Sequence, residues 1–194
     1  TGTLTGNASA ISMGSLTIQV GGTYTATSAT TTITGESDAG MAWNNVETDG
    51  TGFAHSDGKV SFTTPASTAI RENTFYDFEM TADAAGRVYD FRDVTGDTIT
   101  IANDLTIKEG ILKRTTVGDT FTVTGDVSIE SGGTLGHADE TGANNFGSLT
   151  VASGGTYIAT SGTTTMTGGF RKADIAGTLT LNDGTWELGG TGGL

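Results

Sequence analysis

Short segments made of an apolar residue, Ser or Thr, and a second apolar residue recur along the chain. In an extended strand the two apolar side chains lie on one face and the hydroxyl-bearing side chain lies on the other. This alternation predicts short strands with one buried and one solvated face. The segments occur at residues 16–18, 60–62, 105–107, 127–129, 149–151 and 179–181. Their predicted core residues include Leu16, Ile18, Val60, Phe62, Leu105, Ile107, Val127, Ile129, Leu149 and Val151.

The spacing of these segments indicates a repeat with a period of 22. The steps from Leu105 to Val127 and from Val127 to Leu149 are both 22 positions, and the two earlier steps are 44 and 45 positions. Glycines at 110, 132 and 154 have the same period and follow their strands directly. The last step, from 149 to 179, is 30 positions, which predicts an insertion of eight residues around 168–175.

A longer repeat supports this period. Residues 14–36 read GSLTIQVGGTYTATSATTTITGE and residues 147–169 read GSLTVASGGTYIATSGTTTMTGG, with 16 of 23 positions identical. The copies are 133 positions apart, from Gly14 to Gly147, which equals six periods of 22 plus one. We therefore expect the same kind of coil to be used again six coils later.

These patterns predict an all-β fold, a right-handed parallel β-helix (β-solenoid) with coils of about 22 residues. A β-sandwich is the alternative, but it gives no reason for the same residue type to return every 22 positions. We expect residues 1–194 to form a single solenoid domain. Eight or nine coils, stacked about 4.8 Å apart, would form a rod about 40 Å long.

Composition supports strands and limits the partners. The chain has 40 Thr and 31 Gly, which disfavour helices. The formal net charge is −13, so neither nucleic acid nor an anionic membrane is an expected partner. There is no cysteine and no apolar run long enough to span a membrane, so we expect no disulfide framework and no membrane insertion.

The strand motifs resemble those of known surface proteins. The motifs LTIQVGGTY at 16–24, GDVSIESGGTL at 125–135 and ENTFYDFEM at 72–80 resemble bacterial and archaeal surface β-helix repeat proteins. These include adhesin-like, filamentous-haemagglutinin-type and autotransporter-passenger-type solenoids. The resemblance implies a structural or adhesive role at the cell surface or outside the cell. Residues 38–58 and 83–97 depart from the pattern, so the number and path of their coils are not predicted.

Two aspartate columns are the candidate metal ligands. Asp97 and Asp119 are one period of 22 apart, as are Asp104 and Asp126. Stacked carboxylates repel each other, and calcium would relieve that repulsion because it binds carboxylate and carbonyl oxygens. The alternative is that these aspartates are turn residues that hold the backbone through their side chains. No other cofactor is expected.

The sequence predicts no catalytic site, so we expect a non-enzymatic protein. Arg92 and Arg114 are expected to stack without an acidic partner in register, and His55 and His137 have no expected partner. Lys108 is expected to form a surface pair with Glu130, one coil away. The aromatic residues Tyr24, Trp43, Tyr157 and Trp186 are expected to fill the core rather than bind glycans.

Alternative functions remain open. One is a glycan-binding or glycan-cleaving β-helix like those of phage tail spikes. Another is an ice-binding solenoid, because Thr-x-Thr pairs at 98/100 and 120/122 are expected to stack. The next coil in that register carries Gly142 and Asn144, so this array is expected to be short.

The two ends of the chain carry the last prediction. Solenoids need covered end coils because unpaired strand edges recruit other strands. Residues 1–6 and 189–194 contain no charge and no proline. We expect either end-to-end stacking with another copy or continuation into flanking solenoid coils. The residues expected to take part in this contact are Thr1, Thr3, Thr5, Thr185, Thr191 and Leu194.

Overall fold

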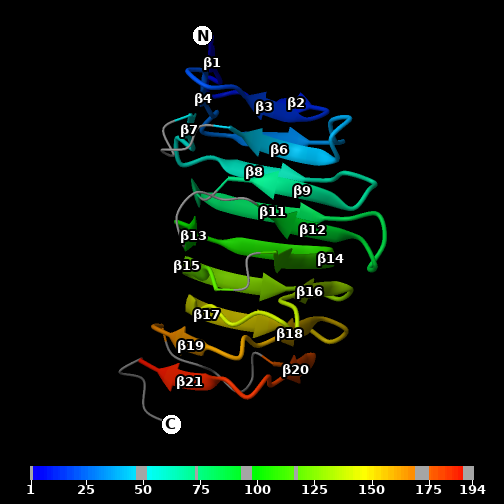
Figure 1. Ribbon diagram of the computed structural model, residues 1–194, viewed down its shortest axis with the longest axis vertical. Coiled ribbons are helices and arrows are strands. Elements are labelled where there is room, and N and C mark those ends of the chain that lie inside the picture. The colour runs from blue at the N-terminus through cyan, green and yellow to red at the C-terminus, as the bar shows by residue number, and fades with distance from the viewer. Residues whose placement is uncertain are drawn as a thin grey trace.

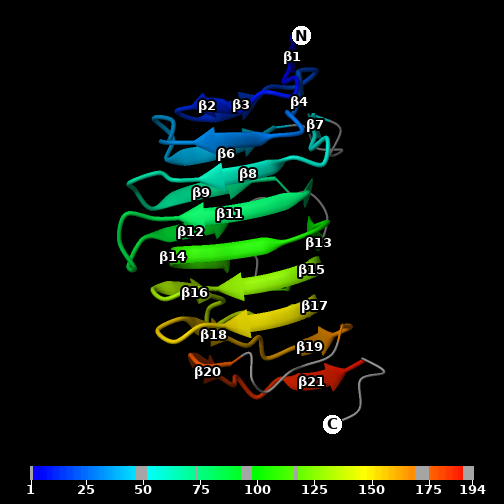
Figure 2. The ribbon, with the colours of Figure 1, turned by 180° about the vertical axis from the view of Figure 1, so that it is seen from behind.

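The computed structural model describes residues 2–46, 52–72, 74–92, 98–115, 118–168 and 175–189. It is a β-solenoid of about eight coils stacked along the long axis, with the N-terminus at one end and the C-terminus at the other (Figures 1 and 2). Every strand pair is parallel, as the sequence predicts. The described residues form no helix, and so none that could cross a membrane.

Each coil passes through three faces, which we number in chain order. The first face contains β1 (Thr3–Thr5), β4 (Thr23–Thr25), β7 (Phe53–Ala54), β10 (Thr74–Phe75), β13 (Thr98–Ile101), the first parts of β15 (Thr120–Ile129) and β17 (Asn144–Val151), β19 (Thr163–Met166) and β21 (Thr185–Leu188). The second face contains β2 (Ile11–Met13), β5 (Thr30–Ile33), β8 (Lys59–Phe62), β11 (Asp77–Thr81), the first part of β14 (Leu105–Arg114) and the second parts of β15 and β17. The third face contains β3 (Leu16–Ile18), β6 (Met41–Asn45), β9 (Thr68–Arg71), β12 (Val88–Phe91), the second part of β14, β16 (Gly133–Leu135), β18 (Thr156–Ile158) and β20 (Thr178–Thr180).

The predicted core column is confirmed on the second face. Leu105 pairs with Val127 and Val127 pairs with Leu149, and all three side chains are buried. The column continues in the other direction through Phe78 to Val60. All ten predicted core residues are buried. Burying apolar surface is the main source of stability in such a stack, because each coil covers the core of its neighbour.

Aromatic side chains fill the interior of the coils in the middle of the molecule. Trp43, Phe62, Phe75 and Phe78 are fully buried, and Phe62 and Phe75 each make several ring contacts. Phe53 of the first face contacts Phe75 at a ring-centroid distance of 5.8 Å, which joins β7 to β10 through side chains. The core is therefore bulkier in the middle coils than in the coils towards the C-terminus, where Ile, Val and Leu dominate.

Two predicted registers are wrong. Leu16 does not belong to the column of Val60: it pairs with Trp43 on the third face, while Val60 pairs with Thr31. Leu179 does not follow Leu149 either: it pairs with Tyr157, a single period before it. The predicted eight-residue insertion therefore does not exist in that form. The physical reason is that all three faces use the same apolar–Thr–apolar pattern, so the pattern alone does not identify the face.

The long repeat shows the same ambiguity. In the first copy the strands β3, β4 and β5 lie on the third, first and second faces. In the second copy the matching strands, the end of β17, then β18 and β19, lie on the second, third and first faces. The two copies are thus rotated by one face, and they are not separated by six whole coils.

The column of glycines is confirmed, but Gly110 lies inside strand β14 and not in a turn. Gly110, Gly132 and Gly154 have φ angles of 95°, 91° and 87°, in the left-handed region that favours glycine. The main-chain N–H of Gly110 donates to the carbonyl oxygen of Gly132, and that of Gly132 donates to Gly154. Elsewhere the coil length varies. The coil from Thr31 to Val60 is longer than the regular period, and the coil from Val60 to Phe78 is shorter.

Candidate functional site

Asp104 and Asp126 lie on adjacent coils, at the corner where the chain enters the second face. The Asp104 carboxylate accepts a hydrogen bond from the Asp126 main-chain N–H at 2.8 Å. The Asp126 carboxylate in turn accepts one from the Ser148 hydroxyl at 2.6 Å. One coil earlier, Asp77 accepts hydrogen bonds from the Asn103 side-chain amide and the Asp104 main-chain N–H.

Asp77 could not be found from the regular period, because it precedes Asp104 by 27 residues. The three carboxylates form a ladder in which each binds the next coil. Their mutual repulsion is offset by N–H and O–H donors, as expected for turn aspartates.

The calcium prediction remains a prediction. Asp97 lies outside the described residues. The Asp119 side chain is buried, and its main-chain oxygen accepts a hydrogen bond from Arg114 at 2.5 Å. In the part of the chain that the structure describes, no three His, Cys, Asp or Glu side chains are grouped so that they could hold a metal ion.

Glu79 joins three coils on the second face. Its Oε2 atom lies 3.1 Å from Lys59 Nζ and 3.1 Å from Lys108 Nζ, and its Oε1 atom accepts a hydrogen bond from Ser61 Oγ at 3.1 Å. Lys108 thus contacts Glu79, on the opposite side from the Glu130 that the sequence predicted. Burial by itself would raise the pKa of Glu79, but the hydrogen bonds and charges of the two lysines outweigh it and lower this pKa.

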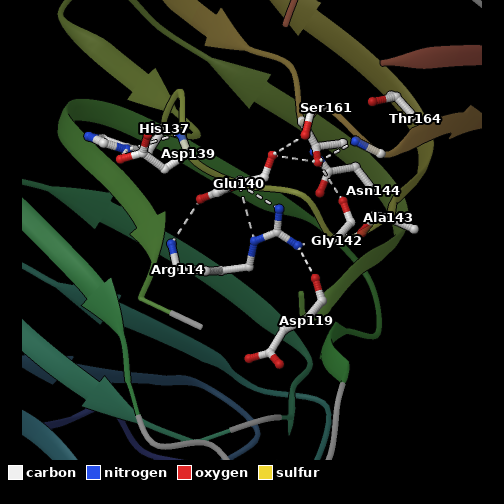
Figure 3. Close-up of polar contacts among 12 residues, drawn as sticks. Arg114, Asp119, His137, Asp139, Glu140, Gly142, Ala143, Asn144, Ser161 and Thr164 are labelled. Atoms are coloured by element: carbon white, nitrogen blue, oxygen red, sulfur yellow. Dashed lines mark hydrogen bonds and ion pairs between the residues drawn. The ribbon is translucent and has the colours of Figure 1, made fainter. Parts of the chain in front are cut away.

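Arg114 is a buried charged residue whose acidic partner was not predicted from the sequence. It pairs with Phe91 on the third face, so its side chain follows a buried aromatic column. Glu140 binds it in three ways: Oε1 accepts the Arg114 main-chain N–H at 2.9 Å, and Oε2 accepts Nε at 3.2 Å and Nη2 at 2.5 Å (Figure 3). Both side chains are almost fully buried, at 3% and 4% exposure. The predicted absence of an acidic partner is therefore wrong for Arg114.

Arg92 also has an acidic neighbour, because its Nη2 atom lies 3.3 Å from Asp90 Oδ2. The two arginines do not stack either, since Phe91 is the residue that pairs with Arg114. Glu140 follows Arg114 by 26 residues and lies in a turn after β16, so a search at the regular period does not find it.

The buried pair needs its remaining donors satisfied, because an unpaired interior charge is costly. Arg114 Nη1 donates to the main-chain oxygen of Asp119, as Figure 3 shows, and lies 3.5 Å from that of Ala143. The guanidinium also lies over the Phe121 ring, 5.8 Å from its centroid. The pair links the coil of β14 to the turn before β17.

A second polar group lies beside this pair. Asn144 Nδ2 donates to the Tyr157 hydroxyl at 2.9 Å, and Thr164 Oγ1 lies 3.3 Å from the same hydroxyl. Burial is the main reason that the pKa of Tyr157 is raised. The Asn144 Oδ1 atom is buried without a hydrogen-bond partner. The interior near Arg114 is therefore polar, whereas the interior of the middle coils is aromatic.

Each histidine has an aspartate two residues later, which corrects the prediction of no partner. His55 Nδ1 lies 3.5 Å from Asp57 Oδ1 and accepts the Asp57 main-chain N–H at 3.2 Å. His137 Nδ1 lies 3.4 Å from Asp139 Oδ2 and from the Asp139 nitrogen. The same arrangement at both turns, at different corners of the solenoid, indicates a role in holding the turns.

The outward Thr-x-Thr pairs lie on the first face. Thr98 pairs with Thr120 and Thr100 with Thr122, as predicted. The next partner of Thr122 is Asn145, not the predicted Asn144, because this coil is one residue longer. The pairs then resume: Asn145 pairs with Thr165, and Thr163 pairs with Thr185. The Thr-x-Thr array is therefore interrupted after two coils, as predicted, and beyond Asn145 it resumes only in part, because Thr165 pairs with Glu187 in the last coil.

Of the four aromatic residues expected in the core, Tyr24, Trp43 and Tyr157 are buried. Trp186 is partly buried and packs against the core, with its ring centroid 5.9 Å from that of Tyr157. Their predicted role as core residues is confirmed.

At the ends, Thr3 and Thr5 lie in the exposed strand β1 and Thr185 lies in β21, also exposed. Thr1, Thr191 and Leu194 lie outside the described residues.

No known protein family, curated protein or solved structure matches this chain. What the chain shares with β-helix repeat proteins is the architecture: parallel coils stacked about 22 residues apart, which make it a β-solenoid.

Proposed function

We propose that this chain is a non-enzymatic structural module that acts outside the cell or on its surface. In this role it presents a stiff rod whose faces adhere to a partner and whose ends join further coils. The partners in this proposal are other copies of the chain, flanking solenoid coils or surface glycans. The proposal includes that the chain is an adhesin-like surface solenoid.

The observation that carries this proposal is the continuous main-chain ladder. On the second face, parallel pairing runs without interruption from β2 through β5, β8, β11 and β14 to β15 and β17. Because each coil is hydrogen-bonded to the coils on both sides, the molecule resists bending as a rod does. A stiff rod suits a spacer or a surface fibre.

Two measurements test the proposal. Small-angle scattering should give the profile of an elongated particle, and a surface-glycan array should give binding without degradation of any polysaccharide. Release of reducing ends from a polysaccharide would overturn the non-enzymatic role and favour the tail-spike-like alternative. A compact, spherical scattering profile would overturn the rod.

The Thr array on the first face favours one second candidate, binding to ice. Its outward columns carry Thr98 and Thr100, Thr120 and Thr122, then an interruption at Asn145, then Thr163 and Thr165, and finally Thr185 and Glu187. Adjacent coils are about 4.8 Å apart. Second-neighbour oxygens in a tetrahedral water network are about 4.5 Å apart, given a hydrogen-bonded O···O distance of about 2.75 Å. The spacing between hydroxyl groups on adjacent coils is therefore close to the spacing of oxygens in ordered water.

Thermal hysteresis tests this candidate. If the first face binds ice, the wild-type chain lowers the freezing point below the melting point, and Thr122→Lys abolishes the gap. Thr150→Lys, on the second face, is the matched control and should retain it. Absence of any gap in the wild-type chain would exclude ice binding.

A further inference from the structure

We propose that two copies of this chain dock head to tail, with the C-terminal coil of one copy covering the N-terminal coil of the next. This inference rests on the proposed structural function and names its partner. It depends on three features: where apolar side chains are exposed, where charge is missing, and how the strands are ordered at each end.

Exposed large apolar side chains gather at the two ends of the rod. Among the described residues they are Leu4 and Val20 near the N-terminus, 49% and 72% exposed, and Leu181 and Leu188 near the C-terminus, 64% and 56% exposed. The coils between them expose no such residue in the part of the chain that the structure describes. Exposed apolar side chains that gather in two places on a protein indicate that these places are contact surfaces.

The N-terminal surface is hollow. A cavity of about 350 Å³ opens there, lined by strands β1, β3 and β4. Its apolar lining includes Leu4, Leu16, Ile18 and Tyr24. The last three are core residues, so the hollow is the open end of the core itself. Leu181 and Leu188 of a second copy supply apolar side chains that can fill it.

Charge favours the contact at this end. The chain has a net charge of −13, so two copies repel each other over most of their surface. Residues 1–35 contain no charged side chain at all. The C-terminal coil carries only Asp183 and Glu187 in its described part. Bringing the C-terminal coil against the neutral N-terminal coils therefore opposes no like charge.

Strand order allows the ladder to continue. The first and third faces end with β21 and β20 at the C-terminus and begin with β1 and β3 at the N-terminus. A second copy placed on the same axis therefore sets β1 beside β21 and β3 beside β20, with all strands parallel. Such a contact joins unlike surfaces and does not close, so it builds a filament.

Sedimentation velocity of the 194-residue chain over a wide concentration range tests the proposal. The wild-type sedimentation coefficient should rise with concentration. Leu188→Asp and Leu4→Asp should each weaken association at least about tenfold, because each buries an unpaired carboxylate in an apolar contact. Thr150→Asp, with the same charge change on a side face, should associate like the wild type. Circular dichroism should confirm that each variant is folded.

Mixing the two end variants gives the decisive readout. Each retains one intact end, so an equimolar mixture of Leu4→Asp and Leu188→Asp should form dimers and nothing larger. A wild-type chain that stays monomeric at every concentration would overturn the proposal and leave flanking coils of a longer polypeptide as the occupant, without affecting the rod function. Association that only Thr150→Asp abolishes would overturn it in favour of side-by-side contact.

Discussion

The two copies of the long repeat adopt the same local structure on different faces of the solenoid. Ile11, Ser12 and Met13 pair with Thr31, Thr32 and Ile33. The residues at the same positions just before the second copy, Asn144, Asn145 and Phe146, pair in the same register with Thr164, Thr165 and Met166. Tyr24 is hydrogen-bonded to Thr31 and Tyr157 to Thr164, seven residues away in both cases. Each tyrosine also meets a tryptophan ring at 5.9 Å.

The copies differ in what surrounds that shared structure. Ile11 lies three residues before the first copy, and the equivalent position before the second copy is the buried Asn144, whose amide binds Tyr157. Glu140 lies seven residues before the second copy, and the equivalent position before the first copy is the exposed Asn7. The first copy thus has an apolar neighbour and the second has the Arg114–Glu140 pair.

This comparison shows that the repeat encodes strands and a corner, not a face. The three faces are similar enough that one sequence fits any of them, provided that the neighbouring coils supply suitable partners. Substitutions at matched positions of the two copies therefore separate what the repeat contributes from what its surroundings contribute.

The largest difference is expected at Glu140. Glu140→Leu should destabilise the protein by about 3–5 kcal/mol, because Arg114 is left buried without its partner. Asn7→Leu, at the equivalent position before the first copy, should change stability by less than about 0.5 kcal/mol because the site is exposed. Urea unfolding measures both.

A double variant controls for the loss of packing. Arg114→Met combined with Glu140→Leu should recover most of the stability, since neither position then holds an unpaired buried charge. If Glu140→Leu alone costs less than Asn7→Leu, the pair does not stabilise this region.

Exchanging Ile11 and Asn144 should give unequal effects. Ile11→Asn should cost about 1–3 kcal/mol, because it replaces a partly buried apolar side chain with an amide whose oxygen, like that of Asn144, would lack a hydrogen-bond partner. Asn144→Ile should be close to neutral, since it removes the unpartnered Oδ1 atom together with one hydrogen bond to Tyr157. Thermal unfolding of both variants gives the comparison. Equal losses would mean that the two surroundings are equivalent.

Lowering the pH should destabilise the middle coils around Glu79 before it destabilises either copy of the long repeat. The pKa of Glu79 is lowered in the folded state, so its contribution is present above the unfolded pKa near 4.5 and is lost as the pH falls through the lower folded value. Because both lysines are partly exposed, the expected contribution is only about 0.5–1 kcal/mol.

Hydrogen exchange at pH 7 and pH 3 locates this effect. Protection should fall in β8, β11 and β14 while β5 and β19 change little, and Glu79→Gln should remove the difference. Uniform loss of protection over all strands would contradict this assignment to Glu79.

The smallest expected effect is that of calcium on the aspartate ladder. If Asp104 and Asp126 bind it, calcium at its Kd should add about 0.4 kcal/mol of stability, and a chelator should remove that gain. Asp126→Asn should abolish the response, and Asp183→Asn, in an exposed turn, should retain it. A melting curve that calcium does not change would leave the ladder as turn residues alone.

The period of the fold could be predicted from the sequence, but the face that each strand occupies could not. Leu105, Val127 and Leu149 stack as expected because their coils are regular, with a glycine of positive φ at the same place in each, at 110, 132 and 154. The prediction places Leu16 in the wrong column because coils of unequal length, such as those from Leu16 to Trp43 and from Thr31 to Val60, precede the regular ones. A strand motif that fits three faces carries no information on which of them it occupies.

The polar interior could not be predicted, because its partners are set by the turns. Arg114 and Glu140 meet at a separation of 26 residues, which matches no repeat in the sequence. The signal that was available is Arg114 itself: a charged residue at an inward position of a strand requires a buried partner. Searching the turn at the same corner of the next coil, residues 136–143, for an acidic residue would have found Glu140.

The direction of the hydrogen bonds gives the rod a particular response to force. Since strands pair only with strands of neighbouring coils, the bonds lie along the long axis, and tension on the two ends pulls coils apart one after another. A coil of about 22 residues adds about 5 Å to the folded rod but about 75 Å as an extended chain, so each detached coil lengthens the molecule by about 70 Å. A stretched molecule therefore yields in discrete steps, dissipating energy at each one while the remaining coils stay intact.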